Sequence, residues 1–175
     1  MTSTSRTMDL GKTTKIRLLI ADDHPLVRLA LRSVLEKHDD FEIIAEAGDG
    51  QEAINLAKEL NPDIVIMDIS MPEVSGLEAT RQIKMDCPET SVLVLTVHTD
   101  NEHILGILEA GASAYLTKRV FGDEIIHTIR ALAVGETVLS PTVWQQVLKY
   151  VSRRIAKPLQ INATDKMTPK ELEIR

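Results

Sequence analysis

Side chains suited to metal and phosphoryl chemistry follow apolar runs at four places in this sequence. Asp22 and Asp23 end IRLLIADD, Asp68 ends DIVIMD, Thr96 ends SVLVLT and Lys118 ends AYLTK. Carboxylate oxygens are the ligands that Mg²⁺ prefers, and a hydroxyl and an ammonium group both bind phosphate oxygens. Three clustered carboxylates repel one another unless a cation shares the site. The set therefore predicts a Mg²⁺ ion beside a phosphoryl group.

Asp68 is the best candidate for a nucleophile, because it ends the most hydrophobic of the four runs. An aspartate can attack phosphorus and form an aspartyl phosphate, while a metal ion offsets the charge on the transferred group. The sequence has no GxxxxGK[ST] loop, and the segment at 48–50, GDG, lacks the spacing of a dinucleotide fingerprint. We therefore expect the phosphoryl donor to be another molecule.

The elements that must position these side chains alternate between apolar runs and helical patterns from residue 16 to about 134. This alternation is typical of βαβ units and of an α/β fold with a parallel sheet. Because the carboxyl ends of parallel strands share one edge of the sheet, the polar side chains should converge there. The second strand, EIIAEA, is the most polar and is predicted to be an edge strand. The five strands are expected near 16–21, 42–47, 63–67, 91–96 and 113–117.

Five helices are predicted between and after the strands from apolar residues spaced three and four apart. Their expected ends are Asn61-Pro62, Cys87-Pro88, Gly111 and Gly135 for the second to fifth helices. For the first helix, the pattern predicts a buried face made of Leu26, Leu29, Ala30, Val34 and Leu35.

Composition limits the function classes that remain. The 175 residues carry a formal net charge of −6 and only 3% aromatic side chains, which argues against a nucleic-acid surface on this chain. The single cysteine, Cys87, excludes an intrachain disulfide and fits a reducing, cytoplasmic location. No run is long enough for a membrane span, and the N-terminus lacks the apolar segment of a secretory signal.

The pattern changes after Gly135. Ser140-Pro141 is a typical helix start and precedes a helix predicted at 141–155, which could dock on the preceding domain, form a dimer, or do both. A polar linker follows at 156–166, and then MTPKELEIR, which contains a capping box. We expect that the sequence is cut inside the first helix of another domain.

Several of these segments resemble the receiver domain of two-component response regulators: ADDHPLVRLALRSVL, DIVIMDISMPEVSGLEATRQIK, VLVLTVH and GASAYLTK. ADDHP and MTPKELEIR resemble the NarL/FixJ subfamily, whose members continue into a LuxR-type helix-turn-helix DNA-binding domain. The resemblance implies a five-stranded, doubly wound, flavodoxin-like receiver fold with a C-terminal helical linker. The implied division is a disordered arm at 1–14, a receiver at 15–135, a helix and linker at 136–167 and the start of the DNA-binding domain at 168–175.

The resemblance also implies a role for each site residue. Asp68 would accept the phosphoryl group from a sensor histidine kinase, and Asp23 would bind Mg²⁺ directly, with Asp22 acting through water. The implied partners are this kinase, a second copy of the chain on activation, and DNA through the truncated output domain only. The remaining positions are Ser70, whose main-chain carbonyl would be a metal ligand, Thr96 and Tyr115 as the switch pair, and Lys118 on the phosphate.

The rival interpretation is a Mg²⁺-dependent phosphatase that forms an aspartyl phosphate. Such an enzyme needs an acid/base aspartate two residues after the nucleophile, and that position is Ser70. We therefore expect a phosphoacceptor switch and not an enzyme. The β-branched Val97 stands where the family usually has a small residue, which predicts slow self-dephosphorylation. His24, beside the acidic pair, is expected to be a helix-start residue and not a metal ligand, because an oxygen-rich site favours Mg²⁺.

Overall fold

The computed structural model describes residues 14–97, 101–118, 122–139, 144–145, 147–149 and 151–153. Within this part of the chain, strands and helices alternate as predicted, and the element boundaries differ from the expected ones by one residue at most for each strand. The elements are β1 (Ile16–Ala21), α1 (Pro25–Leu35), β2 (Phe41–Ala47), α2 (Gly50–Leu60), β3 (Ile64–Asp68), α3 (Gly76–Asp86), β4 (Ser91–Thr96), α4 (Asn101–Glu109), β5 (Ala114–Thr117) and α5 (Asp123–Ala133).

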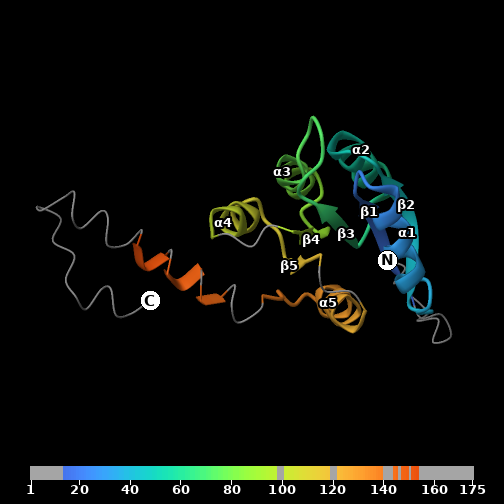
Figure 1. The fold of residues 1–175 in the computed structure, drawn as a ribbon. Helices are drawn as coiled ribbons and strands as arrows, with labels where there is room; N and C mark the ends of the chain where they lie inside the picture. Colours follow the sequence, from blue (N-terminus) through green and yellow to red (C-terminus); the bar gives the residue numbers. More distant parts are fainter. Residues whose placement is uncertain are drawn as a thin grey trace, which may run out of the picture.

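The five strands form one parallel sheet in the order β2-β1-β3-β4-β5 (Figure 1). The chain first moves outward from β1 to β2, then crosses back to β3 and continues in the opposite direction. β1 and β3 therefore flank the topological switch point, where ligands bind in open α/β sheets. The polar strand β2 lies at an edge, which confirms its prediction. The fold is the flavodoxin-like, doubly wound receiver architecture that the resemblance implied.

The inner strands β1, β3 and β4 bury side chains on both faces, because successive side chains point to opposite sides of the sheet, whereas the edge strand β2 is mostly half-buried. Leu19 of β1 and Val65 of β3 belong to one core cluster, which packs against α2, α3 and α4. Their neighbours Leu18 and Ile64 belong to the other cluster, which packs against α1 and α5. Figure 1 shows α2, α3 and α4 on one side of the sheet and α5 on the other. These two cores hold the carboxyl ends of the strands in place.

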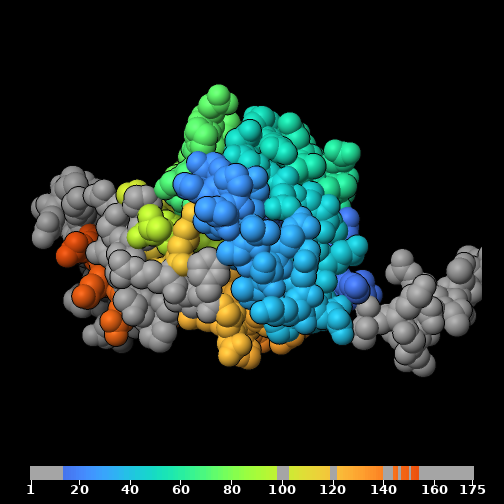
Figure 2. All heavy atoms as spheres, turned by 45° about the vertical axis from the view of Figure 1, so that its right-hand side comes forward, coloured from blue at the N-terminus to red at the C-terminus, as the bar shows by residue number. Residues whose placement is uncertain are grey.

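The predicted buried face of α1 is wrong in part. Leu26 and Leu29 are 79% and 59% exposed, and Ala30 is exposed as well. The core contacts come from Val27, Leu31, Val34 and Leu35, which follow the same helical spacing on a neighbouring stripe. α1 carries apolar residues on both stripes, so its sequence pattern alone does not select the buried one. The outer face of α1 lies in the blue surface at the front of Figure 2.

After α5 the chain returns to the edge of the sheet. The N–H of Val138 donates to the carbonyl of Ser113 at 3.1 Å, and Val138 bridges Ala114 in parallel. Helical residues recur within 144–153, where Val147 is partly buried against the core cluster of α3 and α4. Val147 therefore favours docking, whereas a role in dimer formation stays a prediction. Ser140-Pro141, the linker and the capping box at 168–175 lie outside the described residues.

No helix in the described part of the chain has both the length and the apolar character needed to cross a bilayer.

Candidate functional site

The acidic pair lies just beyond β1, and hydrogen bonds from neighbouring elements fix its backbone. The N–H of Asp22 donates to the carbonyl of Ala47 at 3.0 Å, which extends the β1-β2 pairing by one residue. The guanidinium of Arg28, on α1, donates to the Asp22 carbonyl. The Asp22 side chain is 2% exposed, whereas that of Asp23 is 27% exposed. The pair thus offers one buried and one accessible carboxylate.

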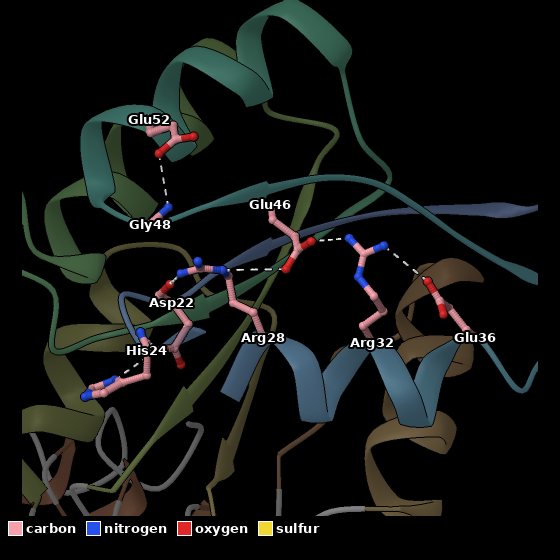
Figure 3. A network of polar contacts seen from close by, with 8 residues as sticks. All are labelled: Asp22, His24, Arg28, Arg32, Glu36, Glu46, Gly48 and Glu52. Atoms are coloured by element: carbon pink, nitrogen blue, oxygen red, sulfur yellow. Dashed lines mark hydrogen bonds and ion pairs between the residues drawn. The ribbon is translucent and has the colours of Figure 1, made fainter. Parts of the chain in front are cut away.

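A chain of ion pairs connects this loop to the edge strand (Figure 3). Arg28 Nε lies 3.5 Å from Glu46 Oε1 on β2, and Arg32 pairs with the other oxygen of Glu46. Arg32 also reaches Glu36 one turn further along, at 3.3 Å. Glu46 therefore holds two arginines of α1, one of which holds the Asp22 carbonyl. This network positions the acidic pair without contacting its carboxylates.

Lys118 bridges the carboxylate of Asp22 and that of Asp68, the last residue of β3. Lys118 Nζ lies 3.0 Å from Asp22 Oδ2 and 3.1 Å from Asp68 Oδ1, and only 15% of the Lys118 side chain is exposed. Burial and the nearby charge of Asp22 raise the pKa of Asp68. Burial acts to lower the pKa of Lys118, but its hydrogen bonds to Asp22 and Asp68 outweigh this effect and leave that pKa raised. Lys118 stays charged and holds the two carboxylates together.

The carboxylates retain oxygens that Lys118 does not use. Asp68 Oδ2 is buried and has no hydrogen-bond partner among the described residues. Such an oxygen is costly to bury unless a cation or a donor reaches it. One ligand atom from each of Asp22, Asp23, His24 and Asp68 lies within 4.8 Å of the others. The donor set, mostly carboxylate oxygens, fits the Mg²⁺ ion that receiver domains bind in their acidic pocket.

The loop after β3 folds back tightly onto the strand end. The N–H of Ser70 donates to Asp68 Oδ1 at 3.4 Å, and the N–H of Gly76 donates to the Ile69 carbonyl at 3.0 Å. Ser70 itself is exposed. On the other side of the loop, a Cβ at Gly50 would lie 2.2 Å from the Val74 carbonyl oxygen. The glycines of α2 and α3 thus allow the loop to pack between the two helices.

The two predicted switch residues are both buried. Thr96 ends β4 and is 1% exposed, and its carbonyl accepts the N–H of Lys118 at 2.9 Å. Tyr115 pairs with Val94 across β4 and β5. The Tyr115 ring is 4% exposed, within the core cluster that includes Ile107 of α4. The structure therefore brings Thr96 to the strand edge beside Lys118 and places Tyr115 inside, toward α4.

His24 lies between the acidic pair and the first residue of α1. It is the N-cap of α1, as expected, but its side chain makes no capping hydrogen bond and turns to the acidic pair instead. His24 Nδ1 lies 3.1 Å from Asp22 Oδ1 and 2.9 Å from Asp23 Oδ1, and the backbone N–H of His24 donates to Asp22 Oδ1 at 2.9 Å. The one feature of the sequence that could have predicted these contacts is the position of His24 directly after two aspartates.

Comparison with known proteins identifies the family of the domain that carries this site. Residues 18–130, more than half of the chain, match the response regulator receiver domain family. The chain belongs to this family. The response regulator is 35% identical over 161 residues to the transcriptional regulatory protein DegU of Brevibacillus brevis, covering 92% of this chain and 67% of that protein. It is 39% identical over 159 residues to the transcriptional regulatory protein LiaR of Bacillus subtilis, covering 91% and 74%.

Solved structures agree with these relatives. A LuxR-family response regulator from Aurantimonas is 35% identical, with a TM-score of 0.73 over 79% of this chain and 99% of that one. The receiver domain of the NarL regulator of Mycobacterium tuberculosis is 28% identical, with a TM-score of 0.68 over 71% and 100%. The resemblance to the NarL/FixJ type is thereby confirmed. The chain is a response regulator of a two-component signalling system, related to transcriptional regulators.

Proposed function

We propose that Asp68 is the phosphoacceptor of this response regulator. The observation that carries the proposal is the state of its carboxylate: it is buried at the carboxyl end of β3, one oxygen contacts Lys118 and the other has no hydrogen-bond partner in the described part of the chain. In the transfer, an Asp68 oxygen forms a bond to phosphorus while the bond from phosphorus to the histidine nitrogen of the sensor kinase breaks. Lys118 offsets the negative charge that arrives.

The metal site of the proposal consists of Asp22, Asp23, Asp68 and the main-chain carbonyl of Ser70. A bound Mg²⁺ supplies charge neutralisation at the transferred group. Asp23 has the accessible carboxylate and is the direct ligand, whereas the buried Asp22 acts through water and through its contact with Lys118. Arg28 and Glu46 hold the backbone that carries this pair.

The read-out of phosphorylation runs through Thr96 and Tyr115. Thr96, whose carbonyl accepts the N–H of Lys118 at the carboxyl end of β4, contacts the phosphate through its hydroxyl. Tyr115 then moves relative to α4. The domain exchanges between an inactive and an active conformation. Phosphorylation can shift this equilibrium only by the difference between the free energies with which the phosphoryl group interacts with the two conformations. Family members generally act as switches of this kind. The changed surface favours a homodimer and, through a LuxR-type output domain, DNA binding that controls transcription.

The test is phosphorylation with a small donor. Wild type is incubated with acetyl phosphate and Mg²⁺, and its intact mass should rise by about 80 Da, the mass of one phosphoryl group. Asp68→Asn should not gain this mass. Asp39→Asn, which changes an exposed aspartate outside the site, should be modified like wild type. An adduct that persists in Asp68→Asn, or a wild type that gains none, contradicts the proposal.

A further inference from the structure

Among the residues that the structure describes, the imidazole of His24 is the one nitrogen donor in the cluster of metal-ligating groups at the strand ends. We propose that His24 Nδ1 is a direct ligand of the metal in this response regulator, and that the site therefore takes an octahedral transition-metal ion such as Ni²⁺ or Co²⁺ as well as Mg²⁺. This rests on the proposed metal site and adds a ligand to it. The ion would bind between His24, Asp23 and Asp68, with Asp22 reached through water.

The first support is the spacing of the donor atoms. Two neighbouring ligands of an octahedral ion lie about 3.0 Å apart when each metal–ligand bond is about 2.1 Å. His24 Nδ1 lies 2.9 Å from an oxygen of Asp23, the direct carboxylate ligand of the proposed site, and this distance matches one edge of such an octahedron. A tetrahedral ion with bonds of about 2.1 Å needs edges of about 3.4 Å, so the spacing favours six-coordinate ions.

The second support is that oxygens in this cluster are left without hydrogen bonds. Asp23 Oδ1 is buried and accepts no hydrogen bond among the described residues, although His24 Nδ1 is 2.9 Å away. Asp68 Oδ2 is in the same state, on a side chain that is 2% exposed. Lys118 contacts the other oxygen of Asp68, Oδ1, and so does not reach Asp68 Oδ2. A cation satisfies these oxygens together.

The chemistry of the ligands determines which metal ions bind more tightly when His24 is present. Mg²⁺ prefers oxygen and keeps several waters, so an imidazole adds little to its binding. Imidazole suits Ni²⁺ and other late first-row ions, which also bind N/O sites more tightly in general. The His24 side chain is 62% exposed, so an ion can reach its nitrogen from solvent without opening the core. The effect of His24 should therefore appear in metal selectivity.

The experiment compares Ni²⁺ and Mg²⁺ affinities of the unphosphorylated protein by calorimetric titration. His24→Asn should weaken Ni²⁺ binding by about tenfold or more and change Mg²⁺ binding by less than about twofold. His127→Asn, which removes an exposed histidine of α5, should change neither affinity. Asp23→Asn should weaken both. With Co²⁺, the visible absorption band should shift in His24→Asn, because an oxygen replaces a nitrogen ligand.

The outcomes separate this inference from the proposed function. Equal loss of Ni²⁺ and Mg²⁺ affinity in His24→Asn, with an unshifted Co²⁺ band, would show that His24 only orients the carboxylates and would overturn the inference. Unchanged Ni²⁺ affinity overturns it as well. If wild type binds Ni²⁺ in a His24-dependent way but does not bind Mg²⁺, the histidine ligand stands and the proposed Mg²⁺ site fails.

Discussion

Gly76, the first residue of α3, touches the backbone of Asp68 so closely that no side chain fits between them. A Cβ at position 76 would lie 1.9 Å from the Asp68 carbonyl oxygen and 2.7 Å from the α-carbon of Ile69. Both neighbours are backbone atoms of the strand end, so they cannot move aside as a flexible side chain can. The helix that follows the proposed phosphoacceptor is therefore held against it by direct backbone contact.

Replacing Gly76 by alanine should distort the strand end that carries Asp68. We expect Gly76→Ala to lower the free energy of unfolding by about 1–3 kcal/mol and to slow phosphorylation by acetyl phosphate. The measurements are urea unfolding and intact mass over time. Gly106→Ala in α4 is the matched control, because its Cβ would lie 3.8 Å from Leu77 and alanine favours helix, for a gain of about 0.5–1 kcal/mol. Equal stability of the two variants would contradict this account.

The corrected face of α1 gives a second prediction. Leu31 is 1% exposed within the core, so Leu31→Ala should cost about 2–5 kcal/mol of unfolding free energy. Leu26 is 79% exposed, so Leu26→Ala should stay within about 0.5 kcal/mol of wild type. Urea unfolding of the two variants measures this. The face predicted from the sequence would instead make the Leu26 variant the unstable one.

The fold could be predicted because strand signals in this chain are redundant. The strands other than β2 are apolar runs followed by a turn, and helix ends coincide with residues such as Asn61 and Gly111, which adopt φ of 47° and 101°. The prediction of the buried face of α1 was wrong in part because the apolar residues of this helix form two adjacent stripes, Leu26-Leu29-Ala30 and Val27-Leu31-Val34. Which stripe is buried depends on where the sheet places the helix, and that is a tertiary property.

The convergence of the site follows from topology alone, because parallel strands bring Asp22 and Asp68 to one edge. The orientation of the His24 side chain does not follow from topology. His24 precedes the first turn of α1 with a backbone ψ of 110°, and its N–H is hydrogen-bonded to Asp22. This local backbone conformation determines where the side chain points. The ion pair between Arg28 and Glu46 could not be predicted from the sequence either, because it joins residues of two different elements that are far apart in the chain.

A pH-dependent contribution to stability should come from Asp40, which precedes β2. Arg130 of α5 donates to both of its oxygens, at 2.9 and 3.2 Å, and this hydrogen bonding lowers the pKa of Asp40. A lowered carboxylate pKa gives stability that is present above the unfolded-state pKa and is lost as the pH falls through the folded-state pKa. The contribution is small, because the pair is exposed and screened by salt.

Asp40→Asn should therefore lower the urea midpoint at neutral pH, and the difference from wild type should shrink as the pH falls into the range where Asp40 is protonated. Added salt at neutral pH should shrink it as well. Urea titrations at a series of pH values measure both effects, and Asp39→Asn, an exposed neighbour, controls for net charge. A difference that grows toward acid pH would mean that the Arg130 contact does not stabilise the folded state.

Val97 should set the lifetime of the phosphorylated state. It directly follows Thr96, the last residue of β4, and is 67% exposed. We expect its β-branched side chain to hinder the water that hydrolyses a phosphoryl group on Asp68, so Val97→Ala should shorten the phosphoryl half-life severalfold. Because the side chain is mostly exposed, unfolding free energy should change by less than about 0.5 kcal/mol.

The half-life is measured by intact mass after the donor is removed. Val134→Ala is the matched control, because Val134 is 74% exposed at the end of α5 and its change should leave the half-life as in wild type. A half-life in Val97→Ala that equals or exceeds the wild-type value would show that the side chain does not limit access of water. In that case the lifetime would depend on the groups proposed to hold the phosphate, Thr96 and Lys118.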